Sequence, residues 1–160
     1  MLRQVGGGWL YQGVDDLIPE DLTFTIVSEA QPSEAQLADL RFAWRVVKHV
    51  KSNAIVVAKG GALRGMGSGQ PNRVKSTEIA LEKAQASWWD DPDPDAVVGS
   101  VLASDAFFPF SWGDSVEKAC IAGVKAIAHP GGSIRDQDAI DCCNKYGVVL
   151  ATTGTRHFRH

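Results

Sequence analysis

Hydrophobic residues recur every three or four positions between residues 34 and 50, which is the periodicity of an amphipathic helix. The residues that form the pattern are Leu37, Leu40, Phe42, Ala43, Val46, Val47 and Val50. Pro32 precedes the segment, and Ser33 carries a hydroxyl that can cap the first turn. The pattern predicts a helix over residues 34–50 with Ser33 as its N-cap.

An unbroken apolar run at residues 54–58 predicts a buried strand. Gly60 and Gly61 follow it, and glycine readily adopts the positive φ angles of a tight turn. The turn leads into residues 62–67, so we expect the two segments to form a β-hairpin.

Helical and strand patterns alternate over the rest of the chain. The predicted elements are a helix that follows Arg73 and runs through Thr77 and Ala86 toward Trp88 and Trp89, strands at residues 97–103, 124–128 and 148–152, and helices at residues 115–122 and 136–146. An acidic, proline-containing segment at residues 90–94 should be a surface loop. The order predicts an α/β fold: a three-layer α/β/α sandwich whose mixed sheet has an antiparallel hairpin first and parallel strands afterwards.

The first 33 residues are rich in glycine, proline and acidic side chains, and only residues 22–27 alternate as a strand would. This segment is too short to be a domain. We therefore divide the chain into an N-terminal arm, residues 1–33, and one α/β subdomain, residues 34–160.

The composition is that of one globular domain, with 160 residues of which 44% are hydrophobic and 22% charged. The formal net charge of −3 argues against a protein that binds nucleic acid or an anionic membrane through bulk charge, but it does not exclude an anionic small-molecule ligand. We find neither a signal-peptide pattern nor a run of about 18 apolar residues, so no membrane segment is predicted.

The cysteines and histidines form no recognisable metal or nucleophile pattern. Cys120, Cys142 and Cys143 suggest neither a disulfide framework nor a zinc site, which fits a reducing cytoplasm. The first two should lie on apolar helix faces, and Cys143 should be partly exposed. His129 lacks the nearby glutamate and paired cysteines of a zinc deaminase, so we expect no zinc. His49 is interpreted as a surface residue.

Five polar or glycine-rich segments fall at predicted strand ends or in the adjoining turns, where open α/β sheets bind their ligands. They are residues 51–53, 67–70, 104–110, 129–133 and 156–160. Gly65, Gly67 and Gly69 are interpreted as structural, because such glycines also terminate strands.

Two of these segments allow two interpretations each. The phenylalanines of residues 104–110 cannot all point inward from one strand, so they face either a flat ligand or the core between helices. The last five residues are either a frayed tail or a segment that Phe158 holds in place, so that Arg156 can meet a phosphate. Both questions stay open at this point.

Together these segments resemble the AICAR transformylase/IMP cyclohydrolase family of purine biosynthesis. The resembling residues are Leu2, Arg3, Gln4 and the following glycines, residues 51–54, residues 65–70, Arg73, residues 104–110, residues 130–136 and residues 156–160. They cover nearly the whole chain in the family's order, and they correspond to the carboxyl-terminal part of the transformylase domain alone. The cyclohydrolase domain and the first transformylase subdomain have no counterpart here.

The resemblance implies a cytidine-deaminase-like fold without zinc. It also implies a cytoplasmic enzyme, a phosphoribosylaminoimidazolecarboxamide (AICAR) formyltransferase, that moves a formyl group from 10-formyltetrahydrofolate to the 5-amino group of AICAR. In the family the cyclohydrolase then closes the ring to IMP, and the transformylase sites form at a homodimer interface.

By the same resemblance, Asn53 is a catalytic-site residue that holds the AICAR carboxamide, Phe107 lines the reacting ring, and Arg156 pairs with the nucleotide phosphate. Each role suits the side chain, since an amide, a ring face and a guanidinium meet those groups well. The implied folate-side residues are Gln70, Arg73, Val74, Pro109 and Phe110. Ser52 and Asp105 resemble members of a potassium site that some family members have.

The chain departs from the family at two points. Residues 111–114 read Ser-Trp-Gly-Asp where many members have an arginine or proline followed by an aspartate. The family's catalytic lysine and histidine lie upstream of the region represented here, and the neighbours Lys48 and His49 occupy a different place. Two hypotheses follow: a transformylase part that is inactive alone, or a non-catalytic nucleotide-binding or dimerisation module of the same fold.

Overall fold

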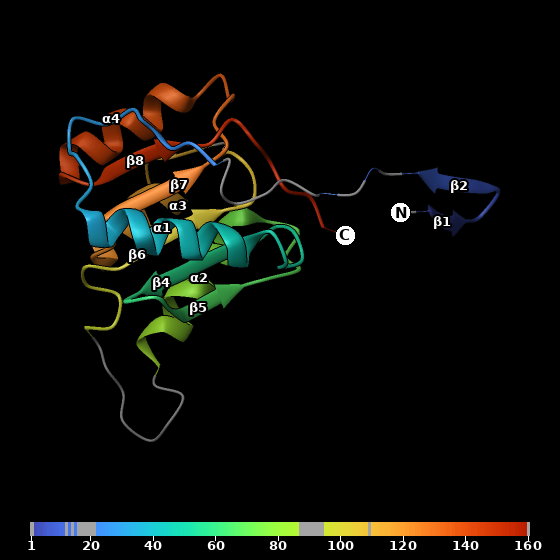
Figure 1. Ribbon diagram of the computed structural model, residues 1–160, viewed down its shortest axis with the longest axis horizontal. Coiled ribbons are helices and arrows are strands. Elements are labelled where there is room, and N and C mark those ends of the chain that lie inside the picture. Colours follow the sequence, from blue (N-terminus) through green and yellow to red (C-terminus); the bar gives the residue numbers. More distant parts are fainter. Residues whose placement is uncertain are drawn as a thin grey trace.

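The computed structural model describes residues 2–11, 13, 15, 22–86, 95–108 and 110–159. Its body is a six-stranded sheet with helices on both faces, and a two-stranded hairpin stands apart from this body (Figure 1). The strands of the sheet are β3 (Thr25–Ile26), β4 (Ile55–Lys59), β5 (Ala62–Gly67), β6 (Val101–Ser104), β7 (Ala126–His129) and β8 (Val149–Thr152). The helices are α1 (Glu34–Val47), α2 (Arg73–Gln85), α3 (Ser115–Ala122) and α4 (Asp136–Tyr146).

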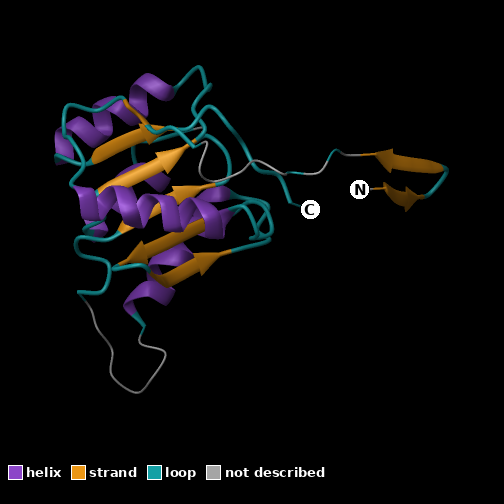
Figure 2. Cartoon of the chain, viewed as in Figure 1, coloured by secondary structure: helices purple, strands orange, loops and turns teal. Residues whose placement is uncertain are grey.

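The sheet is mixed, and its strand order is β3-β8-β7-β6-β4-β5 (Figure 2). Strand β4 pairs antiparallel with both β5 and β6, whereas β6, β7 and β8 pair parallel to one another. Strand β3 adds an antiparallel edge beside β8. The predicted three-layer α/β/α sandwich with an early hairpin and later parallel strands is confirmed.

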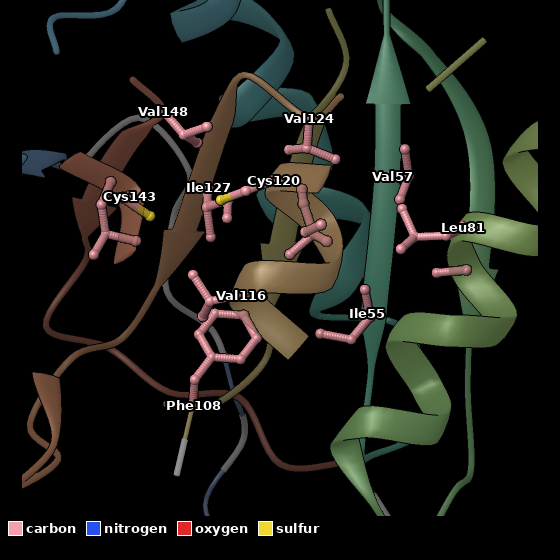
Figure 3. Packing of buried hydrophobic residues seen from close by; sticks show 14 of the residues in the cluster. Ile55, Val57, Leu81, Phe108, Val116, Cys120, Val124, Ile127, Cys143 and Val148 are labelled. Atoms are coloured by element: carbon pink, nitrogen blue, oxygen red, sulfur yellow. The ribbon is translucent and has the colours of Figure 1, made fainter. Parts of the chain in front are cut away.

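Each central strand sends alternate side chains into two separate core layers. In β4, Ile55 and Val57 face the layer shared with α2, α3 and α4, while Val56 and Ala58 face α1. The strands β6, β7 and β8 repeat this division: Leu102, Ile127 and Leu150 lie on the three-helix side, and Val101, Ala103, Ala126, Ala128, Val149 and Ala151 lie on the α1 side. The isoleucine and leucine residues of these strands therefore pack under three helices (Figure 3). In the other layer, α1 contributes the large side chains Leu40 and Trp44.

All three cysteines lie in the three-helix layer, and the expected partial exposure of Cys143 is wrong because that side chain is fully buried. Burial raises the pKa of the Cys142 thiol to about 12. A hydrogen bond from Cys143 lowers the pKa of Cys120 and raises that of Cys143. These thiols serve as small core residues between α3 and α4.

Helix α1 begins as predicted, because the Ser33 side chain accepts from the backbone N–H of Gln36 and the Gln36 side chain accepts from that of Ser33. It ends at Val47 and not at Val50. The backbone N–H groups of His49 and Val50 donate three residues back, so the last turn tightens while Val50 still packs in the core. His49 is exposed, as expected.

The hairpin of β1 (Leu2–Val5) and β2 (Gly8–Tyr11) was not predicted. Its strands flank a two-residue turn in which Gly7 has a φ of 83°, and all its residues are exposed. The predicted strand at residues 22–27 is shorter than expected, since β3 alone pairs with the sheet. Trp88, Trp89 and the loop at residues 90–94 lie outside the described residues. In the described part of the chain, no helix is long and apolar enough to cross a membrane.

Two glycines of β5 let α2 lie directly against the sheet, which supports their structural interpretation. A Cβ atom on Gly67 would sit 1.9 Å from the carbonyl oxygen of Ser76, and one on Gly65 would sit 2.0 Å from that of Ala80. We therefore expect Gly67→Ala to lower the free energy of unfolding by about 3 kcal/mol, because backbone cannot yield as a side chain can. Urea denaturation measures this change.

Gly6→Ala is the matched control, because a Cβ atom there meets nothing within 4 Å. Equal stability of the Gly67→Ala variant and the control would show that α2 does not pack against β5 at this distance.

Candidate functional site

A cavity lies where segments that are far apart in sequence meet at one end of the sheet. Its volume is about 520 Å³. The lining residues are Asn53, Pro71, Asn72, Arg73, Val74, Ala106, Phe107, Phe110, Asp114 and Phe158. They come from the turn before β4, the start of α2, the loop between β6 and α3, and the C-terminal tail, which we define as residues 155–159. Such a junction is where open α/β sheets commonly bind ligands.

A buried ion pair forms the floor of this cavity. The Arg73 guanidinium donates to Asp105 Oδ1 at 2.5 Å, to Ser104 Oγ at 3.2 Å and to Asn53 Oδ1 at 2.9 Å. Arg73 is 8% exposed and Asp105 is 1% exposed. Because each charge is paired and hydrogen-bonded, the two can remain buried.

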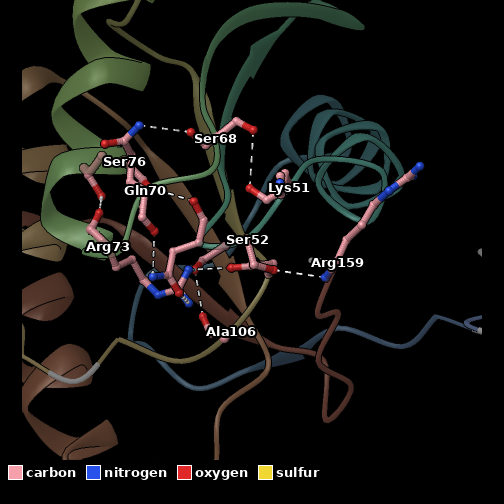
Figure 4. Close-up of polar contacts among 12 residues, drawn as sticks. Lys51, Ser52, Ser68, Gln70, Arg73, Ser76, Ala106 and Arg159 are labelled. Carbon is pink, nitrogen blue, oxygen red and sulfur yellow. Dashed lines mark hydrogen bonds and ion pairs between the residues drawn. The ribbon is translucent and has the colours of Figure 1, made fainter. Parts of the chain in front are cut away.

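Asn53 is held on both its backbone and its side chain. Its backbone N–H and its Nδ2 both donate to the Gln70 carbonyl oxygen, at 3.1 and 3.0 Å, and its own carbonyl accepts from Ser76 Oγ at 2.7 Å (Figure 4). With Arg73 on Oδ1, the amide keeps one N–H and one lone pair for a ligand. The arrangement fixes the orientation of the Asn53 side chain.

The aromatic segment serves both of the roles that were left open. Phe108 is 1% exposed and packs against His129 with ring centroids 5.4 Å apart, so it belongs to the core. Phe107 and Phe110 are 36% and 52% exposed and line the cavity. The Arg135 guanidinium lies 5.1 Å from the Phe110 ring centroid, which places a cation at this end of the cavity.

The C-terminal tail is ordered against the body and is not frayed. The Ser52 backbone N–H donates to the Arg159 carbonyl at 2.8 Å, and the Arg159 N–H donates to Ser52 Oγ at 3.1 Å. Phe158 lines the cavity. Arg156 does not line it, but its guanidinium lies 5.3 Å from the Phe158 ring centroid, so its charge stands at the cavity rim.

The structure thus brings most of the expected site residues together. Asn53, Arg73, Val74, Phe107 and Phe110 all line one cavity. The Gln70 side chain instead donates to the Ser68 carbonyl at 3.2 Å, and Gln70 contributes to the site through its own carbonyl oxygen. Pro109 lies outside the described residues. The roles of these residues toward a ligand stay predictions.

Three lining residues, Pro71, Asn72 and Asp114, were not among those expected at the site. Asn72 caps α2 through its side-chain oxygen, which accepts from the Val74 N–H at 2.8 Å, and Asp114 caps α3. Asparagine and aspartate before a helix are recognisable as caps, and caps at this edge of the sheet would have indicated the cavity wall.

The potassium prediction rests on two oxygens that already have partners. Ser52 Oγ donates to Asp105 Oδ2 at 2.5 Å, and the other carboxylate oxygen accepts from Arg73. The guanidinium would repel a cation at that carboxylate, and a potassium site at Ser52 and Asp105 stays a prediction. Within the described parts of the chain, no cluster of three His, Cys, Asp or Glu side chains could hold a metal ion.

His129 packs against Phe108 and borders a second cavity of about 310 Å³ beside β7 and β8. Burial lowers its pKa to about 4, and the positive charge of Arg73 adds to this effect while Asp136 opposes it. Nδ1 accepts from the Gly131 N–H at 3.3 Å, so the neutral ring carries its proton on Nε2. His129 is therefore uncharged at pH 7.

This buried histidine predicts a pH dependence of stability. Between its unfolded pKa of 6.5 and its folded pKa of about 4, the unfolded chain binds a proton that the folded chain does not, so stability falls as the pH drops through this window. We expect His129→Gln to reduce the loss of unfolding free energy between pH 7 and pH 4.5 by about 2 kcal/mol. Urea denaturation at the two pH values measures the loss for both proteins.

The exposed His49 provides the control, because His49→Gln should leave the loss unchanged. An identical pH dependence for wild type and His129→Gln would contradict a neutral, buried His129.

Comparisons with known proteins were made for the whole chain. The family model of the AICARFT/IMPCHase bienzyme matches residues 1–83. Bifunctional purine biosynthesis protein PurH of Acaryochloris marina is 50% identical over 159 residues, and PurH of Anoxybacillus flavithermus is 52% identical over 156 residues. These matches cover 99% and 98% of this chain but 28% of either relative, so the chain spans little more than a quarter of their length.

Two solved structures show a distant similarity to the chain. RibD of Acinetobacter baumannii matches with a TM-score of 0.49 and 14% identity, over 72% of this chain and 35% of that one. The dCMP deaminase of cyanophage S-TIM5 matches with a TM-score of 0.47 and 20% identity, over 75% of this chain and 98% of that one. At this distance neither structure informs the chemistry of the chain.

Proposed function

Because this chain belongs to the AICARFT/IMPCHase bienzyme family, we propose that it is the carboxyl-terminal part of an AICAR transformylase. In this proposal it binds AICAR and lines part of the folate site for formyl transfer from 10-formyltetrahydrofolate, and it is inactive alone. The proposal includes a cytoplasmic location, a homodimer, and a site completed by the other transformylase half.

The observation that carries the proposal is the shared rim of the cavity. The Asn53 amide and the Phe107 ring line the same cavity, and Arg156 stands beside it on the ring of Phe158. A carboxamide, a flat imidazole ring and a phosphate need such a set of partners: an amide, an aromatic face and a guanidinium.

The folate side of the proposal rests on the opposite wall. Val74 and Phe110 are apolar lining residues against which a pterin ring can pack, and Arg135 lies over the outer part of Phe110 as a cation for the glutamate tail. Arg73 contributes differently from a surface cation, because its guanidinium is taken up by Asp105, Ser104 and Asn53. It supports this wall from beneath.

Formyl transfer requires the amine of AICAR to lose a proton, and two of the described lining residues have ionisable side chains. Arg73 is in the buried ion pair, and Asp114 Oδ1 accepts from the Ser115 backbone N–H at 2.5 Å and from its hydroxyl at 2.9 Å. Because Asp114 is thus engaged as the N-cap of α3, the proposal assigns the base to the other transformylase half.

In the alternative, a non-catalytic binding or dimerisation module, the β1–β2 hairpin would serve as a contact surface. Its exposed side chains include Leu2, Trp9, Leu10 and Tyr11, each at least 60% exposed. Such a patch on an element that stands apart from the body suits contact with another protein surface. The hairpin is compatible with both hypotheses, and the two assays below separate them.

Nucleotide binding tests the proposed phosphate contact. We expect AICAR to bind the chain, and Arg156→Ala to weaken binding by roughly 10- to 100-fold, because a charge-assisted contact contributes about 1.5–3 kcal/mol. Isothermal titration calorimetry measures both affinities. Arg41→Ala, an exposed arginine on α1, should bind as wild type does; equal affinities for wild type and Arg156→Ala would remove the assigned role.

Turnover tests the proposed division of labour. We expect the chain alone to transfer formyl groups at least 10²- to 10⁴-fold more slowly than the chain mixed with a protein that carries the missing transformylase half, because the proton-transfer groups are then absent. A coupled spectrophotometric assay of tetrahydrofolate release measures the two rates. Full activity of the chain alone would refute the proposal, and no rescue by the missing half would favour the non-catalytic module.

A further inference from the structure

The C-terminal tail alternates between inward and outward side chains. His157 is 2% exposed and points into the body, while Arg156 and Phe158 on either side of it are exposed. Alternation of this kind is what extended backbone produces, because successive side chains point to opposite faces. A tail whose backbone is held with His157 inward therefore presents Arg156 and Phe158 outward.

Three segments hold the His157 residue. Its backbone N–H donates to the Asp105 carbonyl at 2.9 Å, and its ring lies against Trp44 of α1 with centroids 5.1 Å apart. Its Nδ1 lies 2.6 Å from Asp15 Oδ2, a residue of the N-terminal arm. Because a carboxylate only accepts, Nδ1 carries the proton in this contact.

Asp15 is itself fixed from the opposite side. The Lys48 Nζ at the end of α1 lies 3.5 Å from Asp15 Oδ1, so one carboxylate joins the tail to the helix. The side chain of Asp15 is 39% exposed and that of His157 is 2% exposed. The contact is thus made at the edge of the body and reaches inward to a buried ring.

The other tail contacts cannot replace this one. The two hydrogen bonds between Ser52 and Arg159 and the bond from the His157 N–H are made by the tail backbone, and none of them reaches the His157 ring. Among the described residues, Asp15 is the hydrogen-bond partner that the ring has, since His157 Nε2 is buried without one.

We propose that Asp15 is a positioning residue for the nucleotide side of the cavity. By accepting from His157 Nδ1, it holds the tail in the one orientation that places the Phe158 ring in the cavity wall and the Arg156 guanidinium at the rim. The inference rests on the proposed function for its ligand, AICAR, but its structural part concerns the tail alone.

The test compares Asp15→Ala and Asp15→Asn with wild type in AICAR affinity, measured by calorimetry. If loss of the contact leaves the tail correctly oriented about a tenth of the time, Asp15→Ala binds AICAR about tenfold more weakly. Asp15→Asn keeps an accepting oxygen and recovers part of the loss. Asp141→Asn, an exposed carboxylate on α4, is the matched control and should bind as wild type does.

Two further readouts report on the tail without AICAR. In Asp15→Ala, the ¹⁵N shifts of the His157 ring should lose the pattern of a protonated Nδ1, and amide hydrogen exchange in residues 156–158 should accelerate about tenfold. Far-ultraviolet circular dichroism checks that each variant is folded.

The outcomes separate this inference from the proposed function. Wild-type affinity of Asp15→Ala for AICAR overturns the positioning role. Failure of wild type to bind AICAR overturns the nucleotide assignment. The ring shifts and the exchange rates then test whether Asp15 orients the tail: unchanged values in Asp15→Ala overturn this role, and the expected changes support it.

Discussion

The site depends on the buried ion pair between Arg73 and Asp105. Arg73 is the first residue of α2, and Asp105 directly follows β6, so the pair joins the helix on one face to the end of a central strand. Breaking such a pair costs about 3–5 kcal/mol, because the remaining charge stays buried. The partners of the pair must therefore stay in place whenever the protein is folded.

The turn before β4, the end of β6 and the tail are attached to this pair. Arg73 also bonds Asn53, which sets the turn before β4, and Asp105 bonds Ser52 through its carboxylate and His157 through its carbonyl. The pocket wall and the tail thus share one polar centre (Figure 4). A hydrogen-bonded network of this kind specifies a single arrangement of loops that have few apolar contacts of their own.

The fold could be predicted from sequence where local signals and burial agree. The helices α3 and α4 match their predicted bounds, since Gly123 and Gly147 end them in the left-handed conformation. The strands that alternate with helices along the chain were recognisable from their continuous apolar runs. The β1–β2 hairpin was not, because its residues are all exposed and a glycine run occupies its turn; no core-facing period marks it.

The sequence indicated which segments meet at the site, but it did not indicate which side chains bond to one another there. Polar residues at strand ends indicate an edge of the sheet, whereas Arg73 pairing with Asp105, 32 residues away, and His157 pairing with Asp15, 142 residues away, leave no local pattern. Phe107 and Phe108 are neighbours that separate into cavity and core only when the loop after β6 takes its conformation. Long-range polar pairing is decided by tertiary structure, which periodicity does not encode.

The same long-range pairing explains why the cavity is suited to holding a ligand and poorly suited to moving protons. Arg73 and Asp105 are bonded to one another and to neighbouring side chains, Asp114 Oδ1 caps α3, and burial keeps His129 neutral with its pKa far below 7. Groups so engaged are rigid, which lowers the entropic cost of orienting a nucleotide. A base that takes a proton must instead be free to change its charge. A pocket wall whose charged groups are paired within the chain therefore functions best when another protein surface supplies the proton-transfer groups.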